Sequence, residues 1–196
     1  MAGAGWGCGC RRIELLSQRA RRTAAEGAEK NRATMPLLIR LAGRDDAAAI
    51  SGVLYESFVE FRALYTDGGF AATALGVEQI LVRMREGPVW VGLRDDVVVG
   101  TVAAVGKGES AYIRGMAVLP AARGLGVGSA LLRAVETWAC EQGCGRMFLS
   151  TTPFLDSAIR LYEKFGFRRV VEEPQDLLGT PLFRMERVAD RRWWWK

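Results

Sequence analysis

The stretch Val118-Leu-Pro-Ala-Ala-Arg-Gly-Leu-Gly-Val-Gly-Ser-Ala130 decides how this chain folds and where its functional site lies. It overlaps the end of an apolar run, Tyr112 to Leu119, which predicts a buried strand that stops at Pro120, and an amphipathic helix follows at once. Glycine allows a positive φ and lets a ligand approach the backbone closely. A helix N-terminus presents unpaired N–H groups and the positive end of the helix dipole. Strand, glycine turn and helix together therefore predict a phosphate-binding site.

Two common phosphate-binding motifs do not fit these glycines. A P-loop requires a glycine, four further residues and then Gly-Lys-Ser/Thr, and no lysine follows Gly124, Gly126 or Gly128. The dinucleotide fingerprint Gly-x-Gly-x-x-Gly/Ala also fails, because its third position falls on Ser129 or on Leu131 in the two possible registers. The ligand is therefore neither of the two that these motifs bind.

The pattern that fits is Arg-x-x-Gly-x-Gly, which begins at Arg123 and is preceded in register by Val118 and Pro120. It resembles the pyrophosphate-binding motif of the GNAT superfamily, the acetyl-CoA-dependent N-acetyltransferases. The alternative, a glycine-rich turn that binds nothing, does not account for these flanking residues. The resemblance implies acetyl-CoA as co-substrate, held by Met116, Ala117, Val118, Arg123, Gly124, Leu125, Gly126, Val127, Gly128 and Ser129.

A second segment carries the same resemblance independently. Ala158-Ile-Arg-Leu-Tyr-Glu-Lys-Phe-Gly-Phe167 is similar to the family pattern Ala-x-x-Leu-Tyr-x-x-x-Gly-Phe, and Gly166 is a residue type that ends helices. The resemblance covers residues 36–188. One position departs from the family, since many members carry an Asn seven residues before the tyrosine, where this chain has Leu155. We therefore expect backbone and apolar contacts to replace the hydrogen bond that this Asn makes to the pantetheine arm.

The resemblance also implies a mechanism in which no acetyl-protein intermediate forms. The thioester lies along the strand at residues 116–118, where a backbone N–H near Met116 polarises its carbonyl, and proximity to a neutral amine drives the transfer. Family members often splay this strand from its neighbour, and here Thr151 to Pro153 begins the opposite side of that gap.

Tyr162 is the candidate general acid. A free thiol titrates near ~8.5 and tyrosine near ~10, so a modest pKa adjustment would allow proton transfer to the departing thiolate. The alternative is an aromatic side chain that only packs its helix against the sheet. The general base is left open among ordered water and four carboxylates, Glu60, Asp67, Glu78 and Glu109.

The acceptor is expected to enter between the first helices and the strand end near Ser150. Candidate substrate-binding residues there are Phe58, Tyr65, Phe70, Ser150 and Thr151. This aromatic segment contains few acids, which favours a small amine over a polycation, although the aromatic residues could equally be core. A protein N-terminus or lysine remains an alternative acceptor. A non-catalytic acyl-CoA sensor and a nucleic-acid-associated module are alternative functions, and a homodimer is left open.

Length and composition predict one domain with its own core, because the chain has 196 residues and is 49% hydrophobic. It lacks a run of about 18 apolar residues, and Met1 to Arg12 has no apolar leader core. We therefore expect a cytoplasmic protein with no membrane partner. The expected organisation is a basic arm or mis-assigned start at 1–34, an acetyltransferase domain at 35–188 and a Trp/Arg-rich tail at 189–196.

The net charge of +5 comes almost entirely from the first 34 residues, which hold seven basic and three acidic side chains. The remainder holds 20 basic and 19 acidic residues, so no nucleic-acid partner is expected for the fold itself. Three interpretations of the arm stay open: an upstream start before Met35, a partner-binding arm, or a transit peptide. The tail Arg191–Lys196 is interpreted as a loosely attached terminus, with an interfacial anchor as the alternative.

The chain has no histidine and only four cysteines, of which Cys140 and Cys144 lie one helical turn apart. Structural zinc needs four Cys or His ligands, so no metal is expected. The absence of histidine also excludes Ser-His-Asp and Cys-His nucleophiles. Catalysis is left to carboxylates, tyrosine, backbone dipoles and positioning.

The expected fold class is α/β of the α+β type: a GNAT fold with a mixed, mostly antiparallel twisted sheet of about seven strands flanked by four helices. Apolar periodicity and turn residues predict strands at 37–41, 89–93, 97–105, 112–119, around 147, 168–172 and 182–188. The same signals predict helices from Asp45 or Asp46 to Tyr65, broken by Gly68-Gly69, and at 77–85, 127–142 and 157–165.

Overall fold

The computed structural model describes residues 36–171 and 175–188. The strands are β1 (Leu38–Leu41), β2 (Val89–Arg94), β3 (Val97–Lys107), β4 (Ser110–Val118), β5 (Arg146–Thr151), β6 (Arg168–Arg169), β7 (Gln175–Leu177) and β8 (Thr180–Val188). The helices are α2 (Ala47–Phe58), α3 (Asp67–Thr73), α4 (Val77–Glu86), α5 (Val127–Glu141) and α6 (Asp156–Lys164). The predicted arm at 1–34 and tail at 189–196 lie outside the described residues.

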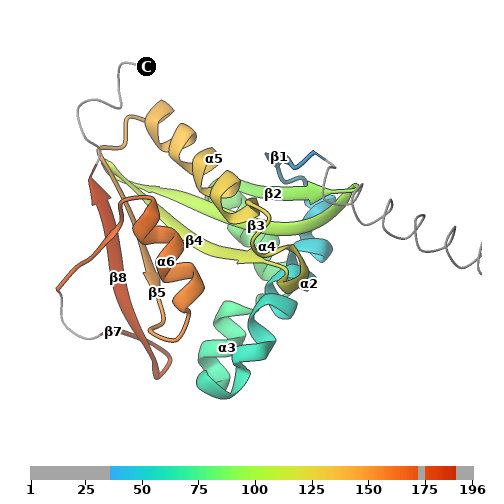
Figure 1. Cartoon of the computed structure of the whole chain (residues 1–196), viewed down its shortest axis with the longest axis horizontal. Coiled ribbons are helices and arrows are strands. Elements are labelled where there is room, and N and C mark those ends of the chain that lie inside the picture. The colour runs from blue at the N-terminus through green and yellow to red at the C-terminus, as the bar shows by residue number, and fades with distance from the viewer. Residues whose placement is uncertain (1–35, 172–174, 189–196) are drawn as a thin grey trace, which may run out of the picture. The chain divides into compact units, whose positions relative to one another are not determined.

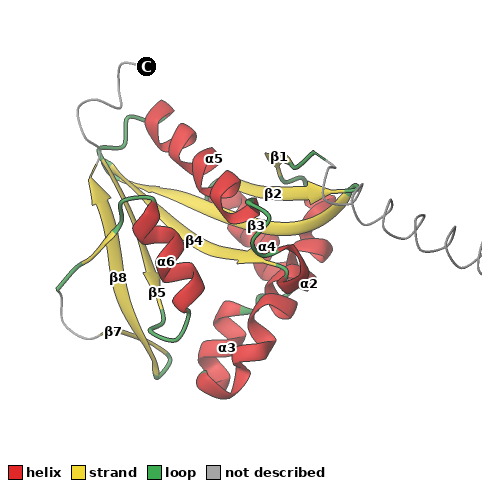
Figure 2. Ribbon diagram, viewed as in Figure 1, coloured by secondary structure: helices red, strands yellow, loops and turns green. Residues whose placement is uncertain are grey.

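The strands form one sheet in the order β1-β2-β3-β4-β5-β8-β6, and β7 pairs with β8. All neighbours are antiparallel except β4 and β5, which run parallel because α5 connects them across one face (Figure 2). The predicted fold class is thereby confirmed. The β2–β3 hairpin turns at Asp95 and Asp96, whose φ values of 51° and 60° are of the kind that tight hairpin turns require.

Helices cover both faces of the sheet, and each face has its own core (Figure 1). Helices α5 and α6 pack on one face, where Val102 and Ile113 of the sheet meet Leu131 and Val135 of α5. Helices α2 and α4 pack on the other face, where the buried side chains include those of Leu54, Ile80, Val91 and Ala117. Every helix that the sequence predicts therefore has an apolar stripe that the sheet buries.

The parallel pair β4–β5 opens after four rungs. Its pairing runs from Ser110 opposite Arg146 to Ile113 opposite Leu149. Beyond that point β4 continues against β3 alone, and β5 continues against β8 alone, so that the two strands diverge in Figure 1. We call this divergence the β4–β5 gap. It lies where the family resemblance predicts that the two strands splay apart.

A β-bulge in β4 lies at the start of this gap. Ala103 pairs with Arg114 and Thr101 pairs with Ala117, so two residues of β4, Gly115 and Met116, lie opposite the single intervening residue of β3. Gly115 has a φ of 58°, a value that side-chain-bearing residues adopt only at a cost. A bulge of this kind bends its strand and increases its twist, which turns the end of β4 away from β5.

The structure corrects part of the predicted element list. The first helix ends at Phe58 and continues as a 3-10 turn from Val59 to Leu64. Gly68 and Gly69 do not break a helix but lie inside α3, which the sequence analysis missed. The three-residue strand β7 was also missed, and strand β6 is shorter than the predicted strand at 168–172.

Gly69 is required by packing instead. A Cβ at this position would overlap Oγ1 of Thr180 and would lie 2.9 Å from the carbonyl oxygen of Leu177. Helix α3 is thus pressed against the β7–β8 hairpin, which lies more than a hundred residues later in the chain. Local glycine statistics could not have predicted a contact of this range.

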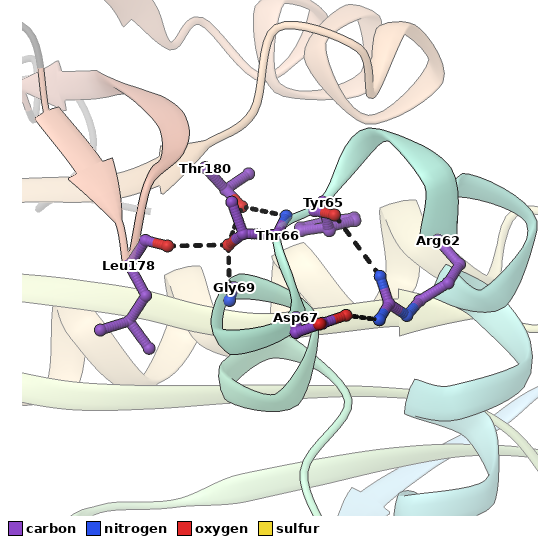
Figure 3. Close-up of polar contacts among 7 residues, drawn as sticks. All are labelled: Arg62, Tyr65, Thr66, Asp67, Gly69, Leu178 and Thr180. Carbon is purple, nitrogen blue, oxygen red and sulfur yellow. Dashed lines mark hydrogen bonds and ion pairs between the residues drawn. The ribbon is translucent and has the colours of Figure 1, made fainter.

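Thr66 fastens the two segments together (Figure 3). Its Oγ1 accepts a hydrogen bond from the amide of Gly69 at 3.0 Å, which caps α3, and donates one to the carbonyl of Leu178 at 2.7 Å. Its own amide donates to Oγ1 of Thr180 at 3.0 Å. Arg62 pairs with Asp67 beside this clasp. The clasp holds the loop before α3 against the hairpin.

The two glycines Gly69 and Gly52 predict stability changes of opposite sign. Gly69→Ala should lower the free energy of unfolding by about 1–3 kcal/mol, because the added methyl group overlaps the hairpin. Gly52→Ala, in α2 with nothing within 4 Å of the new Cβ, should raise it by up to about 1 kcal/mol. Urea unfolding of both variants checks this, and equal effects would contradict the proposed packing role.

Candidate active site

The glycine turn connects β4 to α5 as the sequence predicts. Gly124 and Gly126 have φ values of 76° and 81°, and a Cβ on either would meet nothing within 4 Å. Gly126 is the N-cap residue of α5, and no side chain caps this end of the helix. Glycine is therefore required here by backbone conformation, while the space above the turn is left open.

The amides of this turn have no protein acceptor. In the part of the chain that the structure describes, the N–H groups of residues 124–129 donate no hydrogen bond. The first intrahelical bond is donated by Ala130 to the carbonyl of Gly126 at 3.0 Å. Six successive donors at the positive end of a 15-residue helix fit an anionic ligand such as a pyrophosphate.

Arg123 fixes the turn to the rest of the fold. Its Nη2 donates to the carbonyl of Ser57 at 3.1 Å, and the same guanidinium pairs with Glu60. Its Nε donates to the carbonyl of Val118 at 3.4 Å. The side chain thus ties the glycine turn to the end of α2. The sequence analysis assigned Arg123 to cofactor binding, whereas the contacts that it makes in the structure position the turn.

Helix α6 closes on the N-terminus of α5 at the third glycine. A Cβ on Gly128 would lie 2.8 Å from Cδ2 of Leu161 and 3.2 Å from Cε of Met116. The predicted cofactor residues of β4, Met116 to Val118, therefore lie directly beneath this helix end. The structure brings the two halves of the predicted cofactor site together beside the β4–β5 gap.

Tyr162 lies on α6 in the core of the same face, 6% exposed, with its ring 6.0 Å from that of Phe167. Burial raises the pKa of Tyr162. The hydroxyl makes no hydrogen bond within the described residues. The direction of the pKa shift is opposite to the adjustment that the sequence analysis required, because burial makes the hydroxyl a weaker acid. It also keeps the proton on the oxygen at every physiological pH.

The predicted substrate-binding aromatics form one cluster. The ring centroid of Tyr65 lies 6.4 Å from that of Phe58, 6.1 Å from that of Phe70 and 4.9 Å from that of Phe154. Phe58 and Tyr65 are buried, and burial raises the pKa of Tyr65. Phe154, from the loop between β5 and α6, was missed because its neighbours in sequence gave no aromatic signal. The cluster joins the first helices to the β5 side of the gap.

Ser150 and Thr151, the other two predicted substrate-binding residues, are the last two residues of β5. They pair only with β8, opposite Arg184 and Phe183, and Thr151 is buried. Both therefore lie on the β5 side of the gap, beyond the last rung shared with β4. The predicted entry point near Ser150 is at this strand end.

The four candidate base carboxylates are not equivalent in the structure. Glu60 pairs with Arg123 and Asp67 pairs with Arg62. Glu78 is exposed near the N-terminus of α4, and Glu109 is exposed in the β3–β4 turn. Two of the four are thus held in ion pairs and two lie on the surface, and ordered water stays a candidate beside them.

The sequence analysis missed Gly115, although a glycine inside an apolar strand is a recognised sign of a bulge. It also missed Arg83 of α4 and Arg114 of β4, which lie on the other side of that bulge. Sequence alone offered no signal for them, because their proximity arises only when α4 packs across β4.

Comparison with known proteins agrees with this geometry. Residues 53–167 match the model of the acetyltransferase (GNAT) family. The uncharacterised N-acetyltransferase YjgM of Escherichia coli is 32% identical over 141 residues, which cover 69% of this chain and 83% of that protein. N-acetylaspartate synthetase of Danio rerio is 32% identical over 127 residues, 63% of this chain and 45% of the relative. The chain thus spans less than half of that second relative.

A solved structure shares the fold. The PaiA N-acetyltransferase of Thermoplasma acidophilum, in complex with coenzyme A, superposes with a TM-score of 0.69 at 17% identity, covering 79% of this chain and all of that one. The chain belongs to the GNAT acetyltransferase family, and the predicted enzyme class, N-acetyltransferase, is confirmed. Among the described residues, no helix has the length and apolar character needed to cross a membrane.

Proposed function

We propose that this domain binds acetyl-CoA at the glycine turn and transfers the acetyl group to the primary amine of a small molecule. The observation that carries the proposal is the row of six unpaired amides, residues 124–129, at the start of α5 and beside the β4–β5 gap. A pyrophosphate there would satisfy donors that no protein atom satisfies. The coenzyme A complex of the structural neighbour supports the same ligand class.

The open edge of β4 is the proposed site of the thioester. Beyond Ile113, β4 is paired on one side only, so its backbone groups toward β5 are available to a ligand. A backbone N–H near Met116 would stabilise negative charge on the thioester oxygen as the amine attacks. The thioester supplies the activated acetyl group, and the protein's part is to hold the amine beside it.

Tyr162 is proposed to donate to the departing sulfur. Because burial raises its pKa, its hydroxyl stays protonated, and it acts first as a hydrogen-bond donor to the developing thiolate. Full proton transfer becomes favourable only as charge builds on the sulfur beside it. The amine must lose its own proton, and solvent at the open gap is the proposed acceptor for it.

A small acceptor is favoured over a protein segment by one comparison. The relative named N-acetylaspartate synthetase is named for a small-molecule product. The aromatic cluster of Phe58, Tyr65, Phe70 and Phe154 also fills the space between the first helices and β5. A side chain or small amine needs less room beside such a cluster than an extended peptide does.

Acetyl-CoA binding to the full chain tests the proposed cofactor site. Calorimetric titration should give micromolar binding that Gly126→Glu weakens at least about tenfold, because the new side chain adds a carboxylate near the phosphates and strains a φ of 81°. Gly145→Glu, at an exposed glycine with open space around it, is the matched control. A folded Gly126→Glu variant with unchanged affinity would place the cofactor elsewhere.

Tyr162→Phe tests the proposed acid. Removing the hydroxyl should lower kcat about tenfold or more, while stability should stay the same or rise slightly, since no hydrogen bond to the described chain is lost. The pH profile of wild-type kcat should show no basic limb from this tyrosine below about pH 10, because the pKa is raised above its ordinary value. Tyr55→Phe, at an exposed tyrosine of α2, is the control. Unchanged kcat in Tyr162→Phe would reduce the residue to a packing role.

A further inference from the structure

The face of β4 opposite α5 carries a guanidinium directly over the bulge. Arg83 extends from α4, and a Cβ on Gly115 would overlap its Nη1. Gly115 is favoured as a glycine by its φ of 58°, and the absence of a side chain leaves the space in which the end of Arg83 lies. The guanidinium lies over Gly115, the residue before Met116, and is therefore next to the proposed site of the thioester.

Arg83 makes no direct polar contact within the described residues, and only Glu86 and Tyr112 act on its charge favourably, from a distance. Its guanidinium donates no hydrogen bond and joins no ion pair there, although it is half-buried. Burial, reinforced by the charge of Arg114 and opposed by Tyr112 and Glu86, lowers the pKa of Arg83 to about 10. The side chain is still protonated at neutral pH, so the fold holds a partly desolvated cation that makes no ion pair within the described residues and that Glu86 compensates only in part, which is unfavourable by itself.

Arg114 adds a second cation on the same face. It pairs with Glu86 of α4, a carboxylate that is 48% exposed, while its Nε is buried without a hydrogen-bond partner. Ion pairs with such exposed partners contribute little to stability. Two guanidiniums thus face one exposed carboxylate, and the local charge is positive. We call Arg83 and Arg114 the arginine pair.

Aromatic rings border the arginine pair on the β5 side. Tyr112 of β4 stacks on Phe148 of β5 with ring centroids 5.0 Å apart, and the guanidinium of Arg184 lies 4.1 Å from the Phe148 centroid. Tyr112 and Phe148 form the rung just before the last one of the β4–β5 pairing. The arginine pair therefore lies at the closed end of the gap, on the face away from α5.

We infer that the arginine pair binds a carboxylate of the acceptor, so that the substrates of this enzyme are small amines that carry a carboxylate, such as amino acids. This inference rests on the proposed acetyl transfer to a small amine. A carboxylate accepts two parallel hydrogen bonds from a guanidinium, a geometry that arginine provides and lysine does not. Such a carboxylate would compensate the charge of Arg83 and would accept a hydrogen bond from the buried Nε of Arg114.

The placement suits the reaction geometrically. The cofactor amides lie on the α5 side of β4 and the arginine pair on its α4 side, with the gap between them. A molecule whose carboxylate contacts Arg83 would reach toward Met116 with its amine. The same positive charge disfavours a polyamine or a lysine-rich peptide, because like charges repel in a partly desolvated site.

A purely structural role for Arg83 makes a different prediction. A structural arginine would donate to backbone carbonyls or to a carboxylate, and its loss would lower stability. Here burial and the neighbouring Arg114 act against the charge of Arg83 more than Glu86 compensates it, so Arg83→Met should leave the melting temperature unchanged or raise it. A binding role predicts that the melting temperature is kept while the selectivity for carboxylates is lost. The melting temperature is a readout that does not depend on turnover.

The test compares acids with their amides as acceptors for the full chain with acetyl-CoA, by thiol release. The probes are L-alanine against L-alaninamide and β-alanine against β-alaninamide. Wild type should prefer at least one acid over its amide by about tenfold or more in kcat/KM. In Arg83→Met that ratio should fall toward the ratio set by amine reactivity alone, while Arg83→Lys should retain part of it. Arg85→Met, an exposed arginine of the same helix, should keep the wild-type ratio.

Failure of the inference and failure of the proposed function give different results. Acetylation of the amides at rates equal to the acids, or an acid preference that survives Arg83→Met, overturns the carboxylate site and leaves the transferase intact. Acetyl-CoA binding without transfer to any of the four amines counts against the proposed function. In that case succinate still decides the site. With saturating coenzyme A it should raise the melting temperature of wild type but not of Arg83→Met, and an equal shift or none overturns the inference.

Discussion

The structure depends on one conflict within β4. This strand must pair with β3 along its whole length, yet it pairs with β5 for only four residues. The bulge at Gly115 and Met116 resolves the conflict by inserting one residue opposite β3, which turns the end of β4 away from β5. Beyond the bulge, the edge of β4 that faces β5 has no strand partner among the described residues, and this leaves backbone groups open at the gap.

The gap separates two kinds of chemistry. On the α5 side are neutral donors, the amides of residues 124–129, together with Leu161 and Tyr162 of α6. On the α4 side are charged and aromatic side chains, the arginine pair and the stacked Tyr112 and Phe148. A phosphorylated cofactor and a charged acceptor could each be selected on its own face, and their reacting groups would meet only at the gap.

Contacts between distant segments hold the proposed acceptor side in place. Thr66 and Thr180 tie α3 to the β7–β8 hairpin, and the Tyr65 cluster joins the same region to the loop after β5. Arg123 ties the glycine turn to the end of α2. Each of these contacts is made by one or two side chains across a junction between elements, so protein contacts alone link the walls of the proposed site.

Local pattern explains what could be predicted from sequence. The glycine turn, the α6 motif around Tyr162 and the succession of strands and helices along the chain each depend on residues close together in the sequence, and the fold and family they indicate are confirmed. Gly69 was misread because its need for glycine comes from Thr180, and the arginine pair was missed because two elements must first pack together. The pKa of Tyr162 shifts opposite to expectation because its burial depends on the whole core. The roles of the individual site residues stay predictions.

The most direct test of this account is amide hydrogen exchange of the full chain with and without acetyl-CoA, measured peptide by peptide. We predict strong protection of residues 124–129 and of the end of β4 at residues 115–118, and no change in the β3–β4 turn at the far end of the strand. Exchange in the glycine turn that acetyl-CoA leaves unaltered at saturating concentration would contradict the central claim that this turn and the open edge of β4 hold the cofactor.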